Sequence, residues 1–453
     1  MLQILSYRIN TIFNLYTRIG NNTTSLLWIV VGITILLYSP TFTNDFQLEW
    51  DDTWQVLDNP LVKESSLKEV FYHLTHFWQR QFSPVNSLFY YLIFHISGMD
   101  AQIFHTACLL VHISSTLLVF IIVKKLVVEL LPQTKVPKVN IYTFFTTLLF
   151  AIHPVQVEAV AWISASKILL YGFFTLAALW SYIRYIQTSN SLWLVVTAIT
   201  YCLAFGSKEQ AIILPLNLLL VDYVFGRFTH LNWRSIFIKR ITLEKIPFFL
   251  IALSFWYFSW TNNVGIINQD GYPFYQRAIF GMYSITEYIF RFLAPVKLYF
   301  IHPFPISPGE PLPIYYYGFP FLLASIGYFV WDNYRKANKL VMFSFLFLLT
   351  NLLLVLHIIS FPRTVITADR YMYMSIIGLA LILCWQLDQW LSSEKKQFLI
   401  VVGLLWLLFL SCKTYLRTTD WKDSESTKAN MYELINKKQK AQESEPFNFI
   451  ENE

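Results

Sequence analysis

The sequence carries few charges. Only 14% of its 453 residues are Asp, Glu, Lys or Arg, against about 25% in an ordinary soluble domain. In contrast, 55% are hydrophobic and 18% are aromatic. This composition argues against a soluble domain and predicts a chain that places much of its surface in lipid. The net charge of +6 is spread over short loops, a pattern that informs membrane topology rather than nucleic-acid binding.

Several other features are scarce or missing from the sequence. The four cysteines (Cys108, Cys202, Cys384 and Cys412) lie in or beside apolar runs, where a thiol acts as a small apolar group and implies no disulfide framework. We find no glycine-rich phosphate loop and no signal peptide with a cleavage site. We also find no internal repeat between the two halves, as a transporter usually has.

Long apolar runs predict an all-α polytopic membrane protein. Runs of this kind approach or exceed the roughly 20 residues that cross a bilayer. Before the first run, the first 18 residues alternate apolar and polar side chains, which predicts a helix lying on the membrane within a cytoplasmic segment at 1–24. Eleven spans are expected, at about 25–42, 103–128, 140–152, 168–187, 191–206, 209–225, 246–262, 313–331, 339–360, 373–391 and 397–414.

Two further runs are not counted as spans. Residues 84–97 are too short to cross, so they are expected to lie on the membrane or re-enter it. Residues 275–300 carry Arg277, Glu287 and Arg291, each costing about 2.5–3.5 kcal/mol at mid-bilayer. Leaving 275–300 on the external side keeps the basic loops on one side, as the positive-inside rule requires. The N-terminus is then inside and the C-terminus outside.

This topology divides the chain into three parts. The interfacial segment at 1–24 precedes a transmembrane domain at 25–415, and a short polar tail follows at 416–453. The domain has large external loops at 43–102 and 263–312. The external loops hold charged and histidine side chains, so we expect them to meet in one external cavity, where polar groups at membrane depth indicate a functional site.

Asp51 and Asp52 are the first such residues, directly after the first span. Either could cap the helical segment that follows. Alternatively, partial burial and a like-charged neighbour would raise the pKa of one carboxyl, giving a general base.

Each of the other candidate site residues has both a functional and a purely structural interpretation. His153 and Glu158 could join Asp51 or Asp52 around a divalent cation, although no metal-specific spacing is present. Lys208 and Glu209 could form a self-neutralised pair. Three residues, Arg363, Asp369 and Arg370, could be a solvated loop, yet an arginine there suits a phosphate. His105 and His112 share one face of the second span, where bonding to neighbouring helices is the simpler interpretation.

Six blocks in this order resemble the transmembrane O-mannosyltransferase (TMTC) family and its bacterial relatives, which are GT-C glycosyltransferases. The blocks are WDDTWQVLDNPLVKESSLKEVF (50–71), FSPVNSLFYYLIFHISG (82–98), FHTACLLVHISSTLLVF (104–120), LLFAIHPVQVEAVAWIS (148–164), LAFGSKEQAIILPLNLLLVDYVFG (203–226) and ADRYMYMSIIGL (368–379).

The resemblance implies a GT-C-like bundle that moves a sugar from a polyprenyl-phosphate carrier to a hydroxyl on a protein or glycan. It implies an acidic base in the first loop, at Asp51 or Asp52, and substrate contacts in the HPVQVEAVAW and ADRY blocks. One displacement by a single base would invert the sugar. From the charge pattern, candidate substrate contacts are His153, Glu158, Lys208, Glu209, Arg277, Arg363, Asp369 and Arg370.

The chain also departs from this family. Where relatives have an Arg-Lys-Asp-like run it has Ser166, Lys167 and Ile168, and Ser83 replaces a basic residue before Pro84. Residues 416–453 are too few for two tetratricopeptide repeats of about 34 residues, so a partner protein is expected to replace the family's repeats. Alternatives are a transporter or flippase and an inactive scaffold. We expect a bacterial inner membrane with the site facing the periplasm.

Overall fold

The computed structural model describes residues 23–64, 66–78, 81–228, 240–267, 271–358, 365–391, 396–429 and 431–432. Within these residues the protein is a helical bundle with one two-stranded antiparallel pair, β1 (His302–Pro303) and β2 (Val365–Thr367). Most of the expected interfacial segment at 1–24 lies outside the described residues. The predicted all-α fold class is confirmed.

A helix occupies each range in which a span was expected. They are α2 (Thr23–Tyr38), α6 (Ala101–Leu130), α7 (Val136–Ile152), α9 (Ser166–Thr188), α10 (Leu192–Ser207), α11 (Leu214–Val224), α13 (Ile246–Ile267), α15 (Phe319–Arg335), α16 (Lys339–Leu352), α17 (Ile376–Trp390) and α18 (Lys396–Thr419).

Length and hydropathy make the protein a multi-pass membrane protein. Among the described residues, six helical segments are long and apolar enough to cross a bilayer, namely Thr23–Thr43, Ala101–Leu130, Ile163–Thr188, Ile241–Phe258, Ile314–Arg335 and Lys396–Thr419. A seventh candidate is Val136–Ile152 with Pro154–Ala161, bent by 47°. Because α10, α16 and α17 are apolar but shorter, the total of eleven spans stays a prediction.

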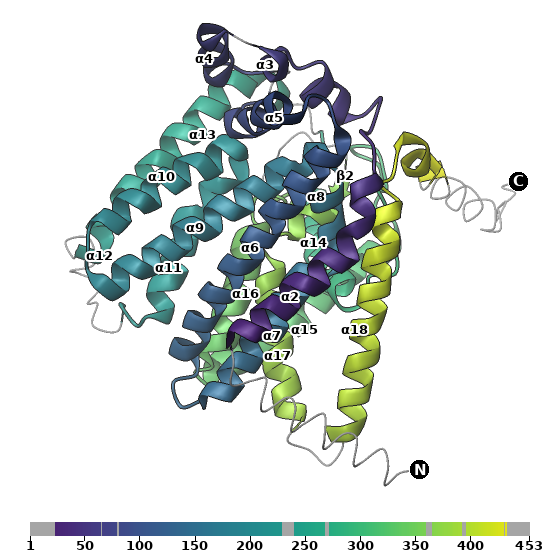
Figure 1. Ribbon diagram of the computed structural model, residues 1–453. Helices are drawn as coiled ribbons and strands as arrows, with labels where there is room; N and C mark the ends of the chain where they lie inside the picture. The colour runs from purple at the N-terminus through teal and green to yellow at the C-terminus, as the bar shows by residue number, and fades with distance from the viewer. Residues whose placement is uncertain are drawn as a thin grey trace, which may run out of the picture.

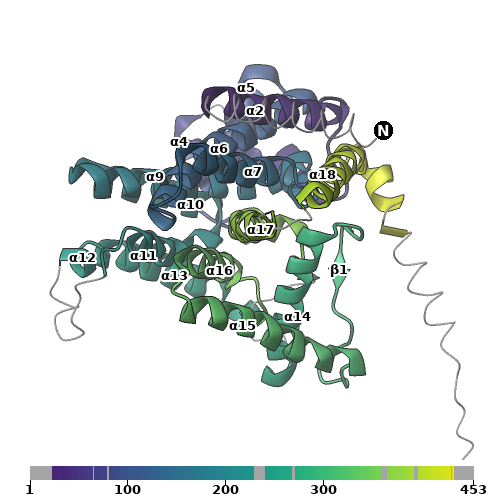
Figure 2. The same cartoon turned by 90° about the horizontal axis from the view of Figure 1, so that it is seen from below.

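The described spans cross between two ends of the molecule. Both α2 and α18 run from the lower end to the upper end in Figure 1. Seen from below, α17 lies near the centre, with α2 and α6 on one side and α15 and α16 on the other (Figure 2). At the lower end the turn between α6 and α7 ends at Lys135, and Lys138 follows in the first turn of α7.

Short helices of the first loop cover the upper end (Figure 1). They are α3 (Pro60–Lys63), α4 (Leu67–Thr75) and α5 (Pro84–Ser97), and α5 packs on α3, α4 and α10. Helix α14 (Phe274–Leu293), with Arg277, Glu287 and Arg291, is not among the helices that qualify as spans in the described chain. Short elements also include α8 (Val157–Ala161) and α12 (Arg240–Leu243).

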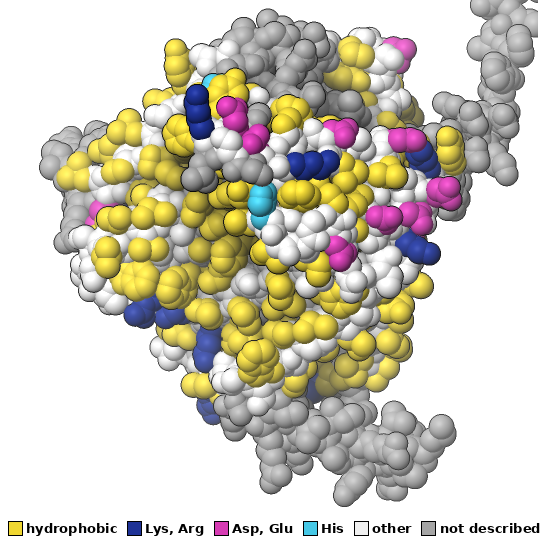
Figure 3. All heavy atoms as spheres, turned by 45° about the horizontal axis from the view of Figure 1, so that its top comes forward, with side chains coloured by type: hydrophobic (Ala, Val, Ile, Leu, Met, Phe, Trp, Pro, Cys, Tyr) yellow, Lys and Arg dark blue, Asp and Glu magenta, His cyan; other side chains and the backbone are white. Residues whose placement is uncertain are grey.

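Charged side chains gather at the upper end. In Figure 3, which brings this end forward, acidic and basic groups are scattered across it, whereas the flank below is largely hydrophobic. An apolar flank under a polar end is the surface expected of a protein whose middle lies in lipid.

Helices α16 and α17 pack with their backbones almost touching. A Cβ added at Gly378 would lie 2.3 Å from the carbonyl oxygen of Ser344. Glycine therefore permits an approach between the two helices that a larger residue would prevent.

We expect Gly378→Ala to lower the free energy of unfolding by about 1–3 kcal/mol, because the helices must separate to admit the methyl group. Gly327→Ala on α15 is the matched control, since nothing lies within 4 Å of its added Cβ. Equilibrium unfolding in detergent measures both. Equal stability of the two variants would contradict this packing argument.

Candidate functional site

Asp51 and Asp52 lie in different environments. Asp52 is fully buried and accepts hydrogen bonds from the backbone N–H of Gln47 (2.9 Å), the backbone N–H of Ser164 (2.8 Å) and the hydroxyl of Ser164. Asp51 is half-buried and accepts from the indole Nε1 of Trp54 and the amide Nε2 of Gln55, both at 3.2 Å. Asp52 thus joins the first loop to the turn that follows α8, whereas Asp51 retains access to solvent.

Neither carboxylate acts as the helix cap that the sequence allowed. Asp52 precedes the helical turn Thr53–Leu57 but makes no capping hydrogen bond there. The cap of the next helix is Asn59, whose side chain accepts from the backbone N–H of Leu61 at 3.1 Å, with Pro60 at the first helical position.

Burial raises the pKa of Asp52 to about 6. Removing the carboxylate from water disfavours its charge more than the hydrogen bonds from Ser164 and Gln47 favour it, and the neighbouring Asp51 raises the pKa further. Asp52 is therefore predominantly ionised at neutral pH, as an acceptor of three hydrogen bonds should be.

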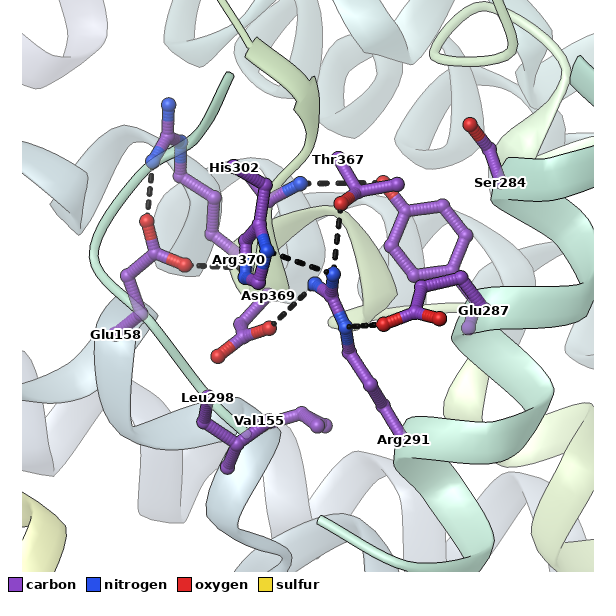
Figure 4. Close-up of polar contacts among 12 residues, drawn as sticks. Val155, Glu158, Ser284, Glu287, Arg291, Leu298, His302, Thr367, Asp369 and Arg370 are labelled. Atoms are coloured by element: carbon purple, nitrogen blue, oxygen red, sulfur yellow. Dashed lines mark hydrogen bonds and ion pairs between the residues drawn. The ribbon is translucent and has the colours of Figure 1, made fainter. Parts of the chain in front are cut away.

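Glu158 and Arg370 form a second connection. The carboxylate of Glu158, which is 1% exposed, accepts from the backbone N–H of Arg370 at 2.9 Å and pairs with its guanidinium. That guanidinium lies over the ring of Trp162, 5.4 Å from its centroid. The block carrying Glu158 and the ADRY block therefore meet, as Figure 4 shows.

Asp369 is held between two arginines. It is fully buried and pairs with Arg291 of α14 at 3.0 Å and with Arg417 of α18 at 2.8 Å. Arg291 also bonds Glu287 (3.0 Å), the hydroxyl of Thr367 (2.8 Å) and Nδ1 of His302 (3.1 Å) (Figure 4). Both carboxylate oxygens of Asp369 have protein partners, so this residue fixes the loop relative to α14 and α18.

His153 also has protein partners on both ring nitrogens. Its Nε2 lies 2.9 Å from the carbonyl oxygen of Phe292, and its Nδ1 accepts from the backbone N–H of Val155 at 3.3 Å. In the described ranges no group of three or more His, Cys, Asp or Glu could hold a metal ion. The cation site considered from the sequence, with His153, Glu158 and an aspartate, is therefore not assembled by these residues.

Two cationic side chains, Lys167 and Arg370, lie within electrostatic range of Asp51. Lys167, at the start of α9, lies within electrostatic range of Asp51, Lys208 and Arg370. Its Nζ donates to the side-chain oxygen of Gln81 at 3.1 Å. Lys208 is 12% exposed and pairs with Glu209 at 3.4 Å. Segments distant in sequence thus bring Lys167 and Arg370 into electrostatic range of one carboxylate, with Lys208 near Lys167, and such a cluster suits an anionic substrate.

Other predicted residues lie elsewhere. Arg277 donates to the carbonyl oxygen of Ile358 at 3.3 Å and lies over the ring of Phe274. Arg363 falls outside the described residues. His112 bonds the hydroxyl of Tyr373 and the carbonyl of Ala151, each at 3.0 Å, which confirms the simpler interpretation made for it from the sequence.

Sequence reasoning missed four residues that shape this region, namely Ser164, Lys167, Arg291 and Arg417. A charge inside or at the end of an apolar run was the available signal for the three basic residues. No local pattern distinguishes Ser164 as a partner of Asp52, because the two are 112 positions apart.

The fold and this cluster define a multi-pass helical membrane protein with a charged site at one end. No family model matches the chain. It is similar to the protein O-mannosyl-transferase F38B6.6 of Caenorhabditis elegans, with 26% identity over 244 residues, 51% of this chain and 31% of that protein. It is also similar to human TMTC4, with 25% identity over 45% of this chain and 30% of that protein.

The chain spans less than a third of the length of these relatives. Among solved structures, the oligosaccharyltransferase of Archaeoglobus fulgidus in the apo form aligns with a TM-score of 0.48 and 14% identity, over 90% of this chain and 56% of that one. The predicted resemblance to the TMTC proteins is confirmed.

We expect Asp52→Asn to change how stability depends on pH. The pKa of Asp52 is raised from 3.8 to about 6 on folding, so the folded state binds the proton more tightly. The contribution of Asp52 to stability is therefore greatest at acid pH and declines as the pH rises from about 4 to about 6. Asparagine does not titrate, so the wild type should lose stability relative to the variant across this window.

Unfolding in detergent at several pH values measures that difference. A difference between the wild type and Asp52→Asn that stays constant from about pH 4 to about pH 7 would contradict the buried, perturbed carboxyl.

Proposed function

We propose that the protein is a GT-C type membrane glycosyltransferase, specifically a hexosyltransferase. It transfers a sugar from a polyprenyl phosphate to a hydroxyl group of a protein or glycan. The observation that carries this proposal is the half-buried Asp51 carboxylate within electrostatic range of Lys167 and Arg370, with Lys208 near Lys167. The similarity to O-mannosyl-transferases supports the reaction class.

Asp51 is the general base in this proposal. A base needs a carboxylate oxygen that an acceptor can approach, and Asp51 is half-buried and bonded only by Trp54 and Gln55 in the described part of the chain. Asp52 is unsuited to the task because it is fully buried and its oxygens accept from Gln47 and Ser164. It holds the backbone from which Asp51 projects.

The reaction is then a single displacement at the anomeric carbon. The acceptor O–H gives its proton to Asp51 while its oxygen forms a bond to that carbon. The bond from this carbon to the phosphate oxygen breaks, and its electron pair leaves with the phosphate. Attack opposite the leaving group inverts the sugar.

The cations stabilise the departing phosphate. A phosphodiester carries one negative charge, whereas a phosphate monoester carries about 1.5–2 at neutral pH. Charge therefore develops on the leaving group during the reaction, and preorganised cations stabilise that developing charge more than they stabilise the bound donor. We assign this role to Lys167, Lys208 and Arg370, with Glu158 fixing Arg370 in place.

Five predicted contacts within the described residues receive no direct substrate role in this proposal. Asp369 and His153 are fully buried with protein partners. Glu158 holds Arg370, and Arg277 donates to the carbonyl oxygen of Ile358. Glu209 pairs with Lys208 and orients it.

The donor reaches the site from the membrane. Its polyprenyl chain lies along the hydrophobic flank, and α5 lies at the entrance, with its N-terminal residues against α10. We propose that the site faces the periplasm of a bacterial inner membrane, on the side opposite the basic turns. The acceptor, or a partner protein that presents it, approaches the polar upper end.

Asp51→Asn should lower kcat by about 10²–10⁴-fold, since general-base assistance is lost while the loop is retained. Purified protein is incubated with a panel of labelled polyprenyl-phosphate hexoses, and donor consumption is followed. Asp58→Asn is the matched control, because Asp58 is an exposed carboxylate in the same loop. Wild-type turnover by a folded Asp51→Asn variant contradicts Asp51 as the base, and no consumption of any donor by the wild type contradicts the function itself.

Lys167→Met should reduce kcat by about 10–100-fold, because one charge facing the leaving phosphate is removed. Lys167→Arg keeps that charge and should retain most of the activity. Lys138→Met, at the opposite end beside Asp388, controls for loss of a lysine. The same donor assay measures all three variants, and an unchanged kcat for Lys167→Met would remove Lys167 from the site.

A further inference from the structure

The last turn of α18 and the chain that follows it pack against the first loop. Three backbone carbonyl oxygens of this segment accept hydrogen bonds from that loop. The side chain of Asn44 donates to Thr418 (3.0 Å), the backbone N–H of Asp45 donates to Lys422 (2.7 Å), and the side chain of Gln47 donates to Trp421 (3.0 Å). Three side chains further along make the reverse contacts. The hydroxyls of Thr427 and Ser424 donate hydrogen bonds to the first loop, and Lys428 forms an ion pair with Glu49. Residues 417–428, which we call the clasp, are therefore not a free polar tail.

Trp421 is the centre of the clasp. It is 2% exposed and stacks on Trp162, with ring centroids 5.3 Å apart and planes inclined by 22°. The ring centroid of Phe300 lies 4.5 Å from that of Trp421 and 5.7 Å from that of Trp162, so the three rings form one cluster. Because the guanidinium of Arg370 lies over the Trp162 ring, Trp421 supports the surface on which Arg370 rests.

Gln47 links the clasp to the aspartates. Its side-chain nitrogen donates to the carbonyl of Trp421, and its side-chain oxygen accepts from Thr427 at 2.7 Å. Its backbone N–H donates to Asp52. The clasp therefore contacts Gln47, which bonds the neighbour of Asp51, and Trp162, on which Arg370 lies. Asp51 and Arg370 themselves lie in different loops.

We infer that the clasp positions the general base and the phosphate-binding arginine relative to one another, with Trp421 as its positioning residue. This inference rests on the proposed function for its catalytic consequence. A misplacement of about 1 Å between a base and a leaving-group cation costs about 10²-fold in rate. A segment that only stabilised the fold would change the amount of folded protein, but not the turnover of each folded molecule.

The test compares Trp421→Ala, Trp421→Phe and Tyr432→Ala in the full chain. Tyr432 is an exposed aromatic residue of the same region and is the control. We expect Trp421→Ala to lower kcat per folded molecule at least about tenfold, with donor KM changed less than about threefold. Phenylalanine should restore at least about half of kcat, since it can stack on Trp162. An unchanged kcat in folded Trp421→Ala overturns the inference.

Hydrogen exchange provides a readout that does not need activity. The amides of Gln47 and Ser164, which donate to Asp52, should exchange about tenfold faster in Trp421→Ala, while amides of α16 stay unchanged. Unaltered exchange at both amides overturns the inference even if the wild type proves inactive. Inactive wild type with faster local exchange contradicts the proposed function alone and leaves the positioning supported.

Discussion

The buried carboxylate of Asp52 is the interaction on which the site depends. Its oxygens accept hydrogen bonds from the backbone N–H groups of Gln47 and Ser164 and from the hydroxyl of Ser164. One carboxylate therefore joins the first loop to the turn after α8. Breaking such a contact leaves buried donors unpaired at about 1–3 kcal/mol each. Asp51 projects from the segment that Asp52 holds. The position of the proposed base is thus a consequence of its neighbour's burial.

Two further charged contacts extend this arrangement. Glu158 fixes Arg370, and Asp369 joins α14 to α18 through Arg291 and Arg417. Each buried ion has its partner, as burial of charge requires. Asp51 differs from these carboxylates, because it is half-buried and accepts hydrogen bonds from the neutral side chains of Trp54 and Gln55. Buried, paired carboxylates therefore have structural roles and the accessible Asp51 has the proposed catalytic one, while Arg370 combines its pair with Glu158 and the proposed phosphate contact.

Much of the fold could be predicted from composition and apolar runs, because crossing a bilayer requires long apolar helices. The site was harder to predict. Asp51 and Asp52 are adjacent in sequence. Their environments differ because Gln47 and Ser164 donate hydrogen bonds to Asp52 and not to Asp51 in the described chain. Asp369 and His153 were expected to contact substrate, yet their partners lie on helices far away in sequence. Local patterns mark a charge in an apolar setting, but they do not identify the distant group that neutralises it.

The most direct measurement is a structure of the protein with a non-hydrolysable polyprenyl-phosphate sugar. Our account predicts density for the phosphate among Lys167, Lys208 and Arg370. The anomeric carbon should lie between that phosphate and a space open to the carboxylate of Asp51. A phosphate bound elsewhere, or a sugar whose reacting face is turned away from Asp51, would contradict the account.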